Sequence, residues 1–175
     1  MQGEVTIRSA VPRDAATLSE FAERTFRDTF GPDNTLENMD LYVAGVFGVE
    51  RQHAELADPR GSVLLIELNA SVVGYAQMTS GAPPHGIGST PAIELQRFYI
   101  AQEYHGLGLA QRLMRRTLDT AFEHDAKTLW LGVWERNARA ISFYRKLGFA
   151  DVGAHVFMLG NDQQIDRIMS RTTRD

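Results

Sequence analysis

A chain of 175 residues, of which 43% are hydrophobic and 23% charged, is long enough to bury a sizeable core as one domain, residues 1–175. It contains no cysteine, which excludes disulfides, a thiolate nucleophile and cysteine-ligated zinc. Its net charge of −4 argues against a nucleic-acid partner, and the lack of a long apolar run or a basic, apolar leader predicts a cytoplasmic protein with no membrane partner.

The first half of the chain predicts a short strand, three helices and a β-hairpin, followed by a loop rich in Gly, Pro, Ser and Thr at Ser80–Pro91. In chain order, these elements are a strand at Val5–Arg8, helices along Leu18–Phe26, Leu36–Val46 and Val49–Leu56, and strands at Ser62–Leu68 and Ser71–Thr79. Asp14 and Thr35 are placed to cap the first two helices, and Gly31 with Pro32 ends the first.

The stretch Glu94–Leu113 organises the prediction, because it passes from a β-prone run through a glycine turn into a helix. Gly106 and Gly108 allow a tight bend, and an apolar stripe at helical spacing begins at Leu109. The unpaired N–H groups at such a helix start suit a phosphate-type anion, although a glycine pair is also common in plain tight turns. The P-loop fingerprint is excluded, because no Lys-Ser or Lys-Thr stands at the motif position after the glycine turn. The dinucleotide fingerprint is excluded, because Gln111 replaces the third glycine.

The second half of the chain adds a strand at Lys127–Trp134, a helix at Asn137–Leu147 that Gly148 ends, and a last hairpin of Phe149–Leu159 with Ile165–Ser170. Three antiparallel strands therefore lead into a strand–helix–strand crossover, whose two strands must lie nearly parallel. The pattern predicts an α/β protein with a mixed sheet and helices on both of its faces.

Asn137 and Tyr144 have ordinary structural explanations, as a helix cap and as a half-buried aromatic side chain. Two motifs in the C-terminal half give them another meaning. The first, Q/R-x-x-G-x-G/A, is matched from His105 to Ala110, with His in place of the usual Gln or Arg. The second, N-x-x-A-x-x-F-Y-x-K-x-G-F, is matched from Asn137 to Phe149. Together they resemble the motifs of the GNAT family of N-acetyltransferases.

A finer similarity points to the bacterial PaiA-type spermidine/spermine N-acetyltransferases within that family. The segments that carry it are Phe26–Phe30, Glu37–Met39, Leu129–Glu135, Gly153–His155 and Asp166–Met169. The resemblance implies the GNAT fold, a mixed, mostly antiparallel sheet of six to seven strands that is splayed at the acyl-CoA site and has helices on both faces. It also implies acetyl-CoA as co-substrate. No metal is expected, because the histidines show no metal-binding spacing.

The resemblance implies that the diphosphate of acetyl-CoA binds the backbone amides of the glycine turn, while its pantetheine arm pairs with the preceding strand like an extra strand. The residues expected to contact acetyl-CoA are Phe98, Tyr99, Ile100, His105, Gly106, Leu107, Gly108, Leu109, Ala110, Asn137, Tyr144 and Lys146. For Lys146, an exposed lysine without a ligand is the alternative interpretation.

By the same resemblance, Tyr144 is expected to protonate the departing CoA thiolate, and Glu94 is the candidate base that removes a proton from the amine. A glutamate at the end of a surface strand explains Glu94 equally well. His85, in the loop that precedes this strand, is the second candidate base.

The expected acceptor is a primary amine, and the subgroup resemblance indicates a polyamine such as spermidine or spermine. The residues expected to bind it are Phe26, Asp28, Phe30, Asn38, His85 and Trp134. Acidic side chains along residues 28–40 could attract a polyamine, although such residues on short helices are commonly only solvated. A protein or peptide acceptor, and a regulatory acetyl-CoA-binding protein with little catalysis, are the alternatives. The family's frequent dimerisation makes a homodimer one option.

Overall fold

The computed structural model describes residues 3–88 and 90–174, which form seven strands and five α-helices joined by short turns. The elements are β1 (Val5–Ser9), α1 (Ala15–Phe30), α2 (Leu36–Val46), α3 (Val49–Ala57), β2 (Gly61–Leu68), β3 (Ser71–Ser80), β4 (Ala92–Ile100), α4 (Leu109–Glu123), β5 (Thr128–Trp134), α5 (Ala138–Lys146), β6 (Ala150–Leu159) and β7 (Asp162–Thr172). Every strand and helix expected from the sequence is present. The last strand begins three residues before the expected Ile165, because Gly160, with a φ of 60°, lets the chain reverse within a tight turn.

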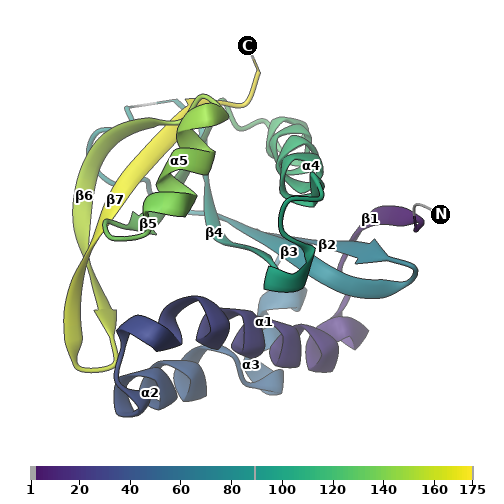
Figure 1. Ribbon diagram of the computed structural model, residues 1–175. Coiled ribbons are helices and arrows are strands. Elements are labelled where there is room, and N and C mark those ends of the chain that lie inside the picture. The colour runs from purple at the N-terminus through teal and green to yellow at the C-terminus, as the bar shows by residue number, and fades with distance from the viewer. Residues whose placement is uncertain (1–2, 89, 175) are drawn as a thin grey trace.

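The strands form one sheet in the order β1-β2-β3-β4-β5-β7-β6 (Figure 1). β4 and β5 pair in parallel, and every other pair of neighbouring strands is antiparallel. The parallel pair is the one joined by the α4 crossover, as such a connection requires. This arrangement confirms the predicted mixed, mostly antiparallel sheet.

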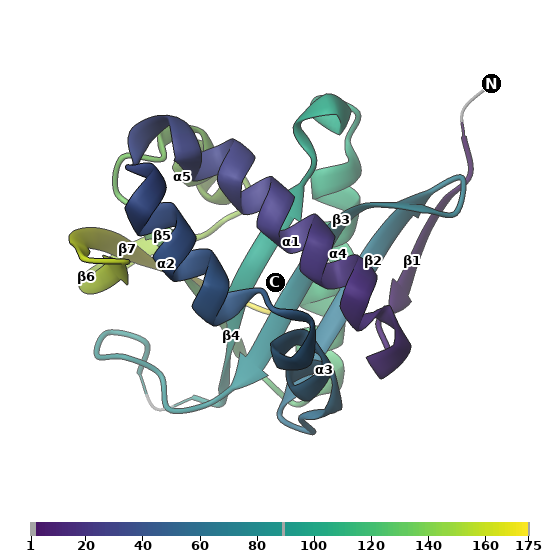
Figure 2. The same ribbon diagram turned by 90° about the horizontal axis from the view of Figure 1, so that it is seen from below.

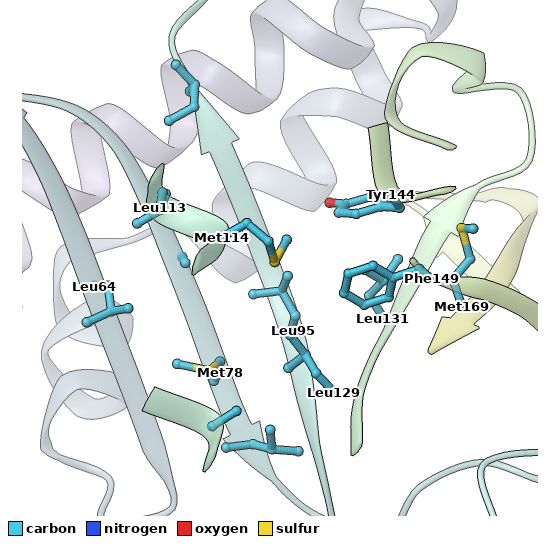
Figure 3. Packing of buried hydrophobic residues seen from close by; sticks show 14 of the residues in the cluster. Leu64, Met78, Leu95, Leu113, Met114, Leu129, Leu131, Tyr144, Phe149 and Met169 are labelled. Carbon is cyan, nitrogen blue, oxygen red and sulfur yellow. The ribbon is translucent and has the colours of Figure 1, made fainter. Parts of the chain in front are cut away.

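Helices cover both faces of the sheet, with α4 and α5 on one face and α1, α2 and α3 on the other (Figures 1 and 2). The burial of β2 follows from this layering: Leu64 and Ile66 pack into the cluster under α4, whereas Val63 and Leu65 pack into the cluster under α1. A strand covered on both faces is apolar throughout rather than at alternate positions. Figure 3 shows part of the cluster on the α4 and α5 face, where the ring of Tyr144 packs edge-on against Phe149 at 5.5 Å.

β4 and β5 stay side by side for only three residue pairs, from Ala92 opposite Thr128 to Glu94 opposite Trp130, before they separate. A β-bulge lies at the point of separation, because Leu95 faces Met78 of β3 whereas Arg97 faces Gln77, which leaves Gln96 as an extra residue. A bulge bends a strand and re-aims its side chains. β4 therefore turns away from β5 while it remains paired with β3.

The predicted side-chain cap of α2 is present, whereas that of α1 is not. Thr35 caps α2 by accepting a hydrogen bond from the Asn38 amide at 3.3 Å, as expected. The expectation for Asp14 was wrong. Asp14 stands at the cap position of α1, but its carboxylate accepts from the Val11 amide and pairs with Arg8 at 2.9 Å, so it joins β1 to the helix instead of capping it.

Candidate active site

The separation of β4 and β5 creates a cavity of about 130 Å³ that reaches both layers of helices. Its walls combine aromatic rings with several polar and charged side chains. The lining residues are Phe26, Phe30, Tyr42, Phe47, Leu95, Gln96, Arg97, Phe98, Tyr99, Gly132, Val133, Trp134, Asn137, Ala140, Tyr144, Phe157, Leu159, Gln164 and Asp166. We refer to it as the acceptor cavity. A hollow that combines aromatic walls with convergent polar groups suits a small molecule that has both apolar and polar parts.

A second cavity, of about 310 Å³, lies between the end of β4 and α5. Its lining residues are Thr29, Phe98, Tyr99, Ile100, Gln102, His105, Ala110, Asn137, Arg139, Ala140, Phe143 and Tyr144. We refer to it as the arm cavity. It shares Phe98, Tyr99, Asn137, Ala140 and Tyr144 with the acceptor cavity, so these five residues lie where the two spaces meet.

The glycine turn continues the arm cavity toward the start of α4, where Gly106, Gly108 and Ala110 line a smaller hollow. Gly106 and Gly108 have φ values of 83° and 76°, which favour glycine, and a Cβ on either would meet no atom within 4 Å. The space above the turn is therefore open. His105 stands where the motif has Gln or Arg. Its ring stabilises the turn by a 2.7 Å hydrogen bond to the carbonyl of Ile100.

Tyr144 and Asn137 enter the shared space from α5. Tyr144 is 8% exposed, and burial raises the pKa of its hydroxyl, so this hydroxyl is protonated at neutral pH. Within the described residues it donates to no acceptor, which leaves its proton available. Asn137 caps α5, as predicted, because its Oδ1 accepts from the Ala140 amide at 3.2 Å. Its side-chain NH₂ is then free to donate to another group.

The glutamate predicted as a base lies beside the cavity rather than on its wall. Ile93 and Leu95 pack into the cluster under α4, so the intervening Glu94 points to the opposite face of the sheet. Burial raises the pKa of Glu94, and the nearby charge of Arg97 opposes this shift. The wall of the acceptor cavity begins at the next residue, Leu95.

The residues predicted to bind the acceptor fall into two groups. Phe26, Phe30 and Trp134 line the acceptor cavity, where Phe30 and Trp134 make an edge-on ring contact at 6.1 Å. Three other predicted residues lie outside its lining: Asp28 is exposed, His85 is exposed in the 81–91 loop, and Asn38 accepts a 2.8 Å hydrogen bond from the Asn161 amide. Asn38 thus ties α2 to the β6–β7 turn.

Among the residues predicted to bind acetyl-CoA, Lys146 is the one that lies apart. It is exposed on α5 and borders a shallow depression with Glu135 and Asp151. Arg139, the second residue of the same helix, lines the arm cavity instead and reaches the glycine-turn hollow. The sequence motif contains no signal for this arginine, because its position is a variable one.

The geometry of a glycine turn, a separated parallel strand pair and a shared cavity agrees with the family comparison. A model of the Acetyltransferase (GNAT) family matches residues 20–149. The chain belongs to the GNAT family of acetyltransferases. It is therefore an N-acetyltransferase that depends on acyl-CoA.

Relatives of this GNAT acetyltransferase include an uncharacterized N-acetyltransferase of Mycobacterium tuberculosis, which is 34% identical over 90% of this chain and 97% of the relative. The spermine/spermidine N(1)-acetyltransferase of Bacillus subtilis is 32% identical, but over only 31% of this chain and 37% of the relative. The crystal structure of the PaiA N-acetyltransferase from Thermoplasma acidophilum in complex with coenzyme A has a TM-score of 0.78, with 19% identity, over 97% of this chain and 99% of that chain. The last comparison shows a shared fold.

Two charged groups of the acceptor cavity were missed by sequence reasoning. Arg97 on β4 is 11% exposed at its side chain and pairs with Glu55 of α3 at 2.7 Å, while it also donates to Gln77 at 2.8 Å. Asp166 on β7 is 13% exposed at its side chain and lies 3.7 Å from His155. Arg97 follows Gln96 on β4, and Asp166 is one of many polar residues on β7, so neither position has a periodic signal that marks it as part of a site.

Across residues 3–88 and 90–174, no three His, Asp or Glu side chains lie close enough together to hold a metal ion. None of the described helices has the length and apolarity needed to cross a bilayer.

Proposed function

We propose that this acetyltransferase moves an acetyl group from acetyl-CoA to a primary amine by direct attack, with both substrates bound at once. The observation that carries the proposal is the meeting of the two cavities at Tyr144 and Asn137, where β4 and β5 part. A thioester in the arm cavity and an amine in the acceptor cavity would come together at this point. Such proximity turns a bimolecular reaction into an effectively intramolecular one.

On this proposal, the glycine turn binds the diphosphate of acetyl-CoA through backbone amides from Gly106 to Ala110 at the start of α4. The pantetheine arm runs along the part of β4 that has left β5, where Phe98 and Ile100 offer backbone groups, and the NH₂ of Asn137 donates to it from α5. A backbone N–H near Tyr99 or Ile100 then stabilises the negative charge that develops on the thioester oxygen.

The chemistry of the amine explains why the acceptor cavity needs a proton acceptor. An alkyl amine has a pKa of about 10.4, so only about one molecule in ~2500 is neutral at pH 7, and reaching that form costs roughly 4.6 kcal/mol. The neutral amine attacks the thioester carbon, the C–N bond forms, and the C–S bond then breaks. Tyr144 gives its proton to the departing thiolate and is reprotonated from the new amide nitrogen. Glu94 is the base that the family resemblance suggests.

The finer part of the proposal is a polyamine acceptor such as spermidine or spermine. It is supported by the short match to the Bacillus subtilis spermine/spermidine enzyme and by the acidic residues Asp28 of α1, Asp33 of the following turn and Glu37 of α2. Asp40 of α2 pairs with Arg27. The aromatic walls of the acceptor cavity also suit a cationic alkyl chain. A peptide or protein amine is the competing acceptor class.

The test is a thiol-release assay with acetyl-CoA over spermidine, spermine, diamines, aminoglycosides, amino acids and peptides. We expect turnover with an amine, and the highest kcat/KM with a polyamine. A higher kcat/KM for a peptide would replace the polyamine, whereas tight CoA binding in calorimetry without thiol release from any acceptor would favour a regulatory protein. Action in the cytoplasm and a homodimer belong to the same proposal, and cell fractionation and light scattering test them.

A further inference from the structure

Asp166 is the one carboxylate that lines the acceptor cavity among the described residues. It lies on β7 opposite Trp134 of β5, and its side chain is 13% exposed. Its Oδ2 lies 3.7 Å from Nε2 of His155 on the neighbouring strand β6. His155 is 36% exposed at its side chain, so this imidazole lies close to Asp166 and is also in contact with solvent.

Gly132 provides the space that Asp166 and His155 occupy. A Cβ at this position of β5 would lie 3.2 Å from Asp166 Oδ2 and 3.2 Å from Nε2 of His155, closer than ordinary side-chain contacts. A side chain at this position would therefore force Asp166 or His155 to shift. The strand thus leaves room for a carboxylate on the cavity wall beside the ring of Trp134.

The charges around Asp166 leave it without a strong cationic partner inside the protein. His155 faces it from β6, and Arg97 lines the same cavity from β4 but is bound to Glu55. Tyr42 of α2 and Tyr144 of α5 also line this cavity. Burial raises the pKa of the Asp166 carboxyl, while His155 lowers it. Within the described residues, the only ion-pair partner of this desolvated carboxylate is a histidine. A bound cation would therefore stabilise it.

We infer that Asp166 binds the ammonium group of the acceptor and takes its proton, and that His155 passes this proton to solvent. The inference rests on the proposed function and assigns its base to β7 rather than to Glu94. Asp166 shares the acceptor cavity with Tyr144, whereas Glu94 does not line it. The aromatic rings around Asp166 hold the alkyl part of the amine and exclude water from the ammonium group.

The proton balance of the reaction follows from this arrangement. The ammonium group transfers one proton to the Asp166 carboxylate, and the neutral nitrogen attacks the thioester carbon. Asp166 returns that proton to solvent through His155, which accounts for the one proton that the overall reaction releases. The second proton of the attacking nitrogen reaches the thiolate by way of Tyr144.

The first test measures binding without chemistry. Calorimetry measures the binding of butylamine and of spermidine to the CoA-saturated wild type, Asp166→Asn and Asp119→Asn. Asp119→Asn is the control, because Asp119 lies on α4 and its carboxylate is 3.3 Å from the guanidinium group of Arg174. We expect Asp166→Asn to weaken amine binding by about tenfold or more, the usual effect of losing a charged hydrogen bond, with CoA affinity and the control unchanged. Equal amine affinity in wild type and Asp166→Asn, or no amine binding to wild type, would overturn the inference.

The second test separates proton acceptance from binding. We expect Asp166→Asn to lower kcat/KM for butylamine by about 100-fold, but by much less for trifluoroethylamine, which is already neutral near pH 7.5. An equal loss for both amines would refute the role as base. His155→Gln should lose activity that added imidazole restores, and a lack of rescue would remove His155 from the path. If wild type shows no thiol release, the proposed function fails, while the binding test still decides the ammonium site.

Discussion

Glu94 of β4 faces Trp130 of β5 in the last aligned pair before the two strands part. Gln96, the extra residue of the bulge, follows two positions later, so β4 changes direction immediately after this pair. The residues of β4 that line the acceptor cavity all come after it, and those of β5 follow Trp130 in the same way. One short stretch of pairing therefore fixes the position of both walls of the site.

Tyr144→Phe tests the proton donor. The variant keeps the ring that packs against Phe149 but loses the hydroxyl, so we expect kcat to fall by about tenfold while the KM for acetyl-CoA changes little. The effect is modest because a thiolate is a good leaving group. Steady-state kinetics at saturating amine measure it, and an unchanged kcat would reject the acid role.

Glu94→Gln tests the base suggested by the family resemblance. Because the Glu94 side chain lies outside the cavity lining, we expect the variant to retain the rise of kcat/KM with pH on the acidic limb and to lose less than about tenfold in rate. The measurement is the pH profile of thiol release for wild type and variant. Disappearance of the acidic-limb inflection would instead identify Glu94 as the base.

Asn137 combines a structural role with a proposed ligand contact, and two substitutions separate these. Asn137→Ser keeps an oxygen that can cap α5, whereas Asn137→Ala removes the cap and should cost about 1 kcal/mol of stability. Both variants lose the NH₂ group, so we expect both to bind CoA more weakly while only Asn137→Ala melts earlier. Calorimetry and thermal unfolding provide the two readouts. Normal CoA binding by Asn137→Ser would show that Asn137 is only a cap.

The Glu55–Arg97 pair predicts a pH dependence of stability. Burial raises the pKa of Glu55, but hydrogen bonds from Arg97 and Gln77 and the charge of Arg97 outweigh it, so the pKa lies below its usual range. A carboxyl with a lowered pKa in the folded state stabilises the fold at pH values above its unfolded pKa of about 4.3, and the contribution is lost as pH falls through the folded pKa.

Glu55→Gln should therefore destabilise the protein at pH 7 by about 3 kcal/mol, because Arg97 loses its buried partner. The difference from wild type should shrink below about pH 4, where Glu55 itself becomes protonated. Urea unfolding at both pH values measures the effect. Glu103→Gln, which removes an exposed pair with Arg24, is the control and should change stability by less than about 1 kcal/mol. A difference that stays constant with pH would contradict the assignment.

The sequence predicted what depends on local pattern: the elements, their order, the glycine turn and the capping roles of Thr35 and Asn137. It did not predict what depends on neighbours across the sheet. The bulge at Gln96 appears only in the register between β3 and β4. Asp166 and His155 come together because β6 and β7 pair, and Gly132 of a third strand makes room for them. Asp14 was misjudged because Arg8 competes for its carboxylate.

The positions of the two cavities also bear on the order in which the amine and the coenzyme bind and leave. Beyond the residues that they share, the arm cavity extends along α5 to the start of α4, whereas the acceptor cavity extends toward α2 and the β6–β7 hairpin. The amine and the coenzyme can thus arrive by separate routes, and neither has to wait for the other to depart. We expect double-reciprocal plots of initial rate against one substrate to intersect when the other substrate is varied. We also expect CoA and the amine to bind the enzyme together in an unreactive complex. No acetyl group should be transferred to the enzyme in the absence of amine.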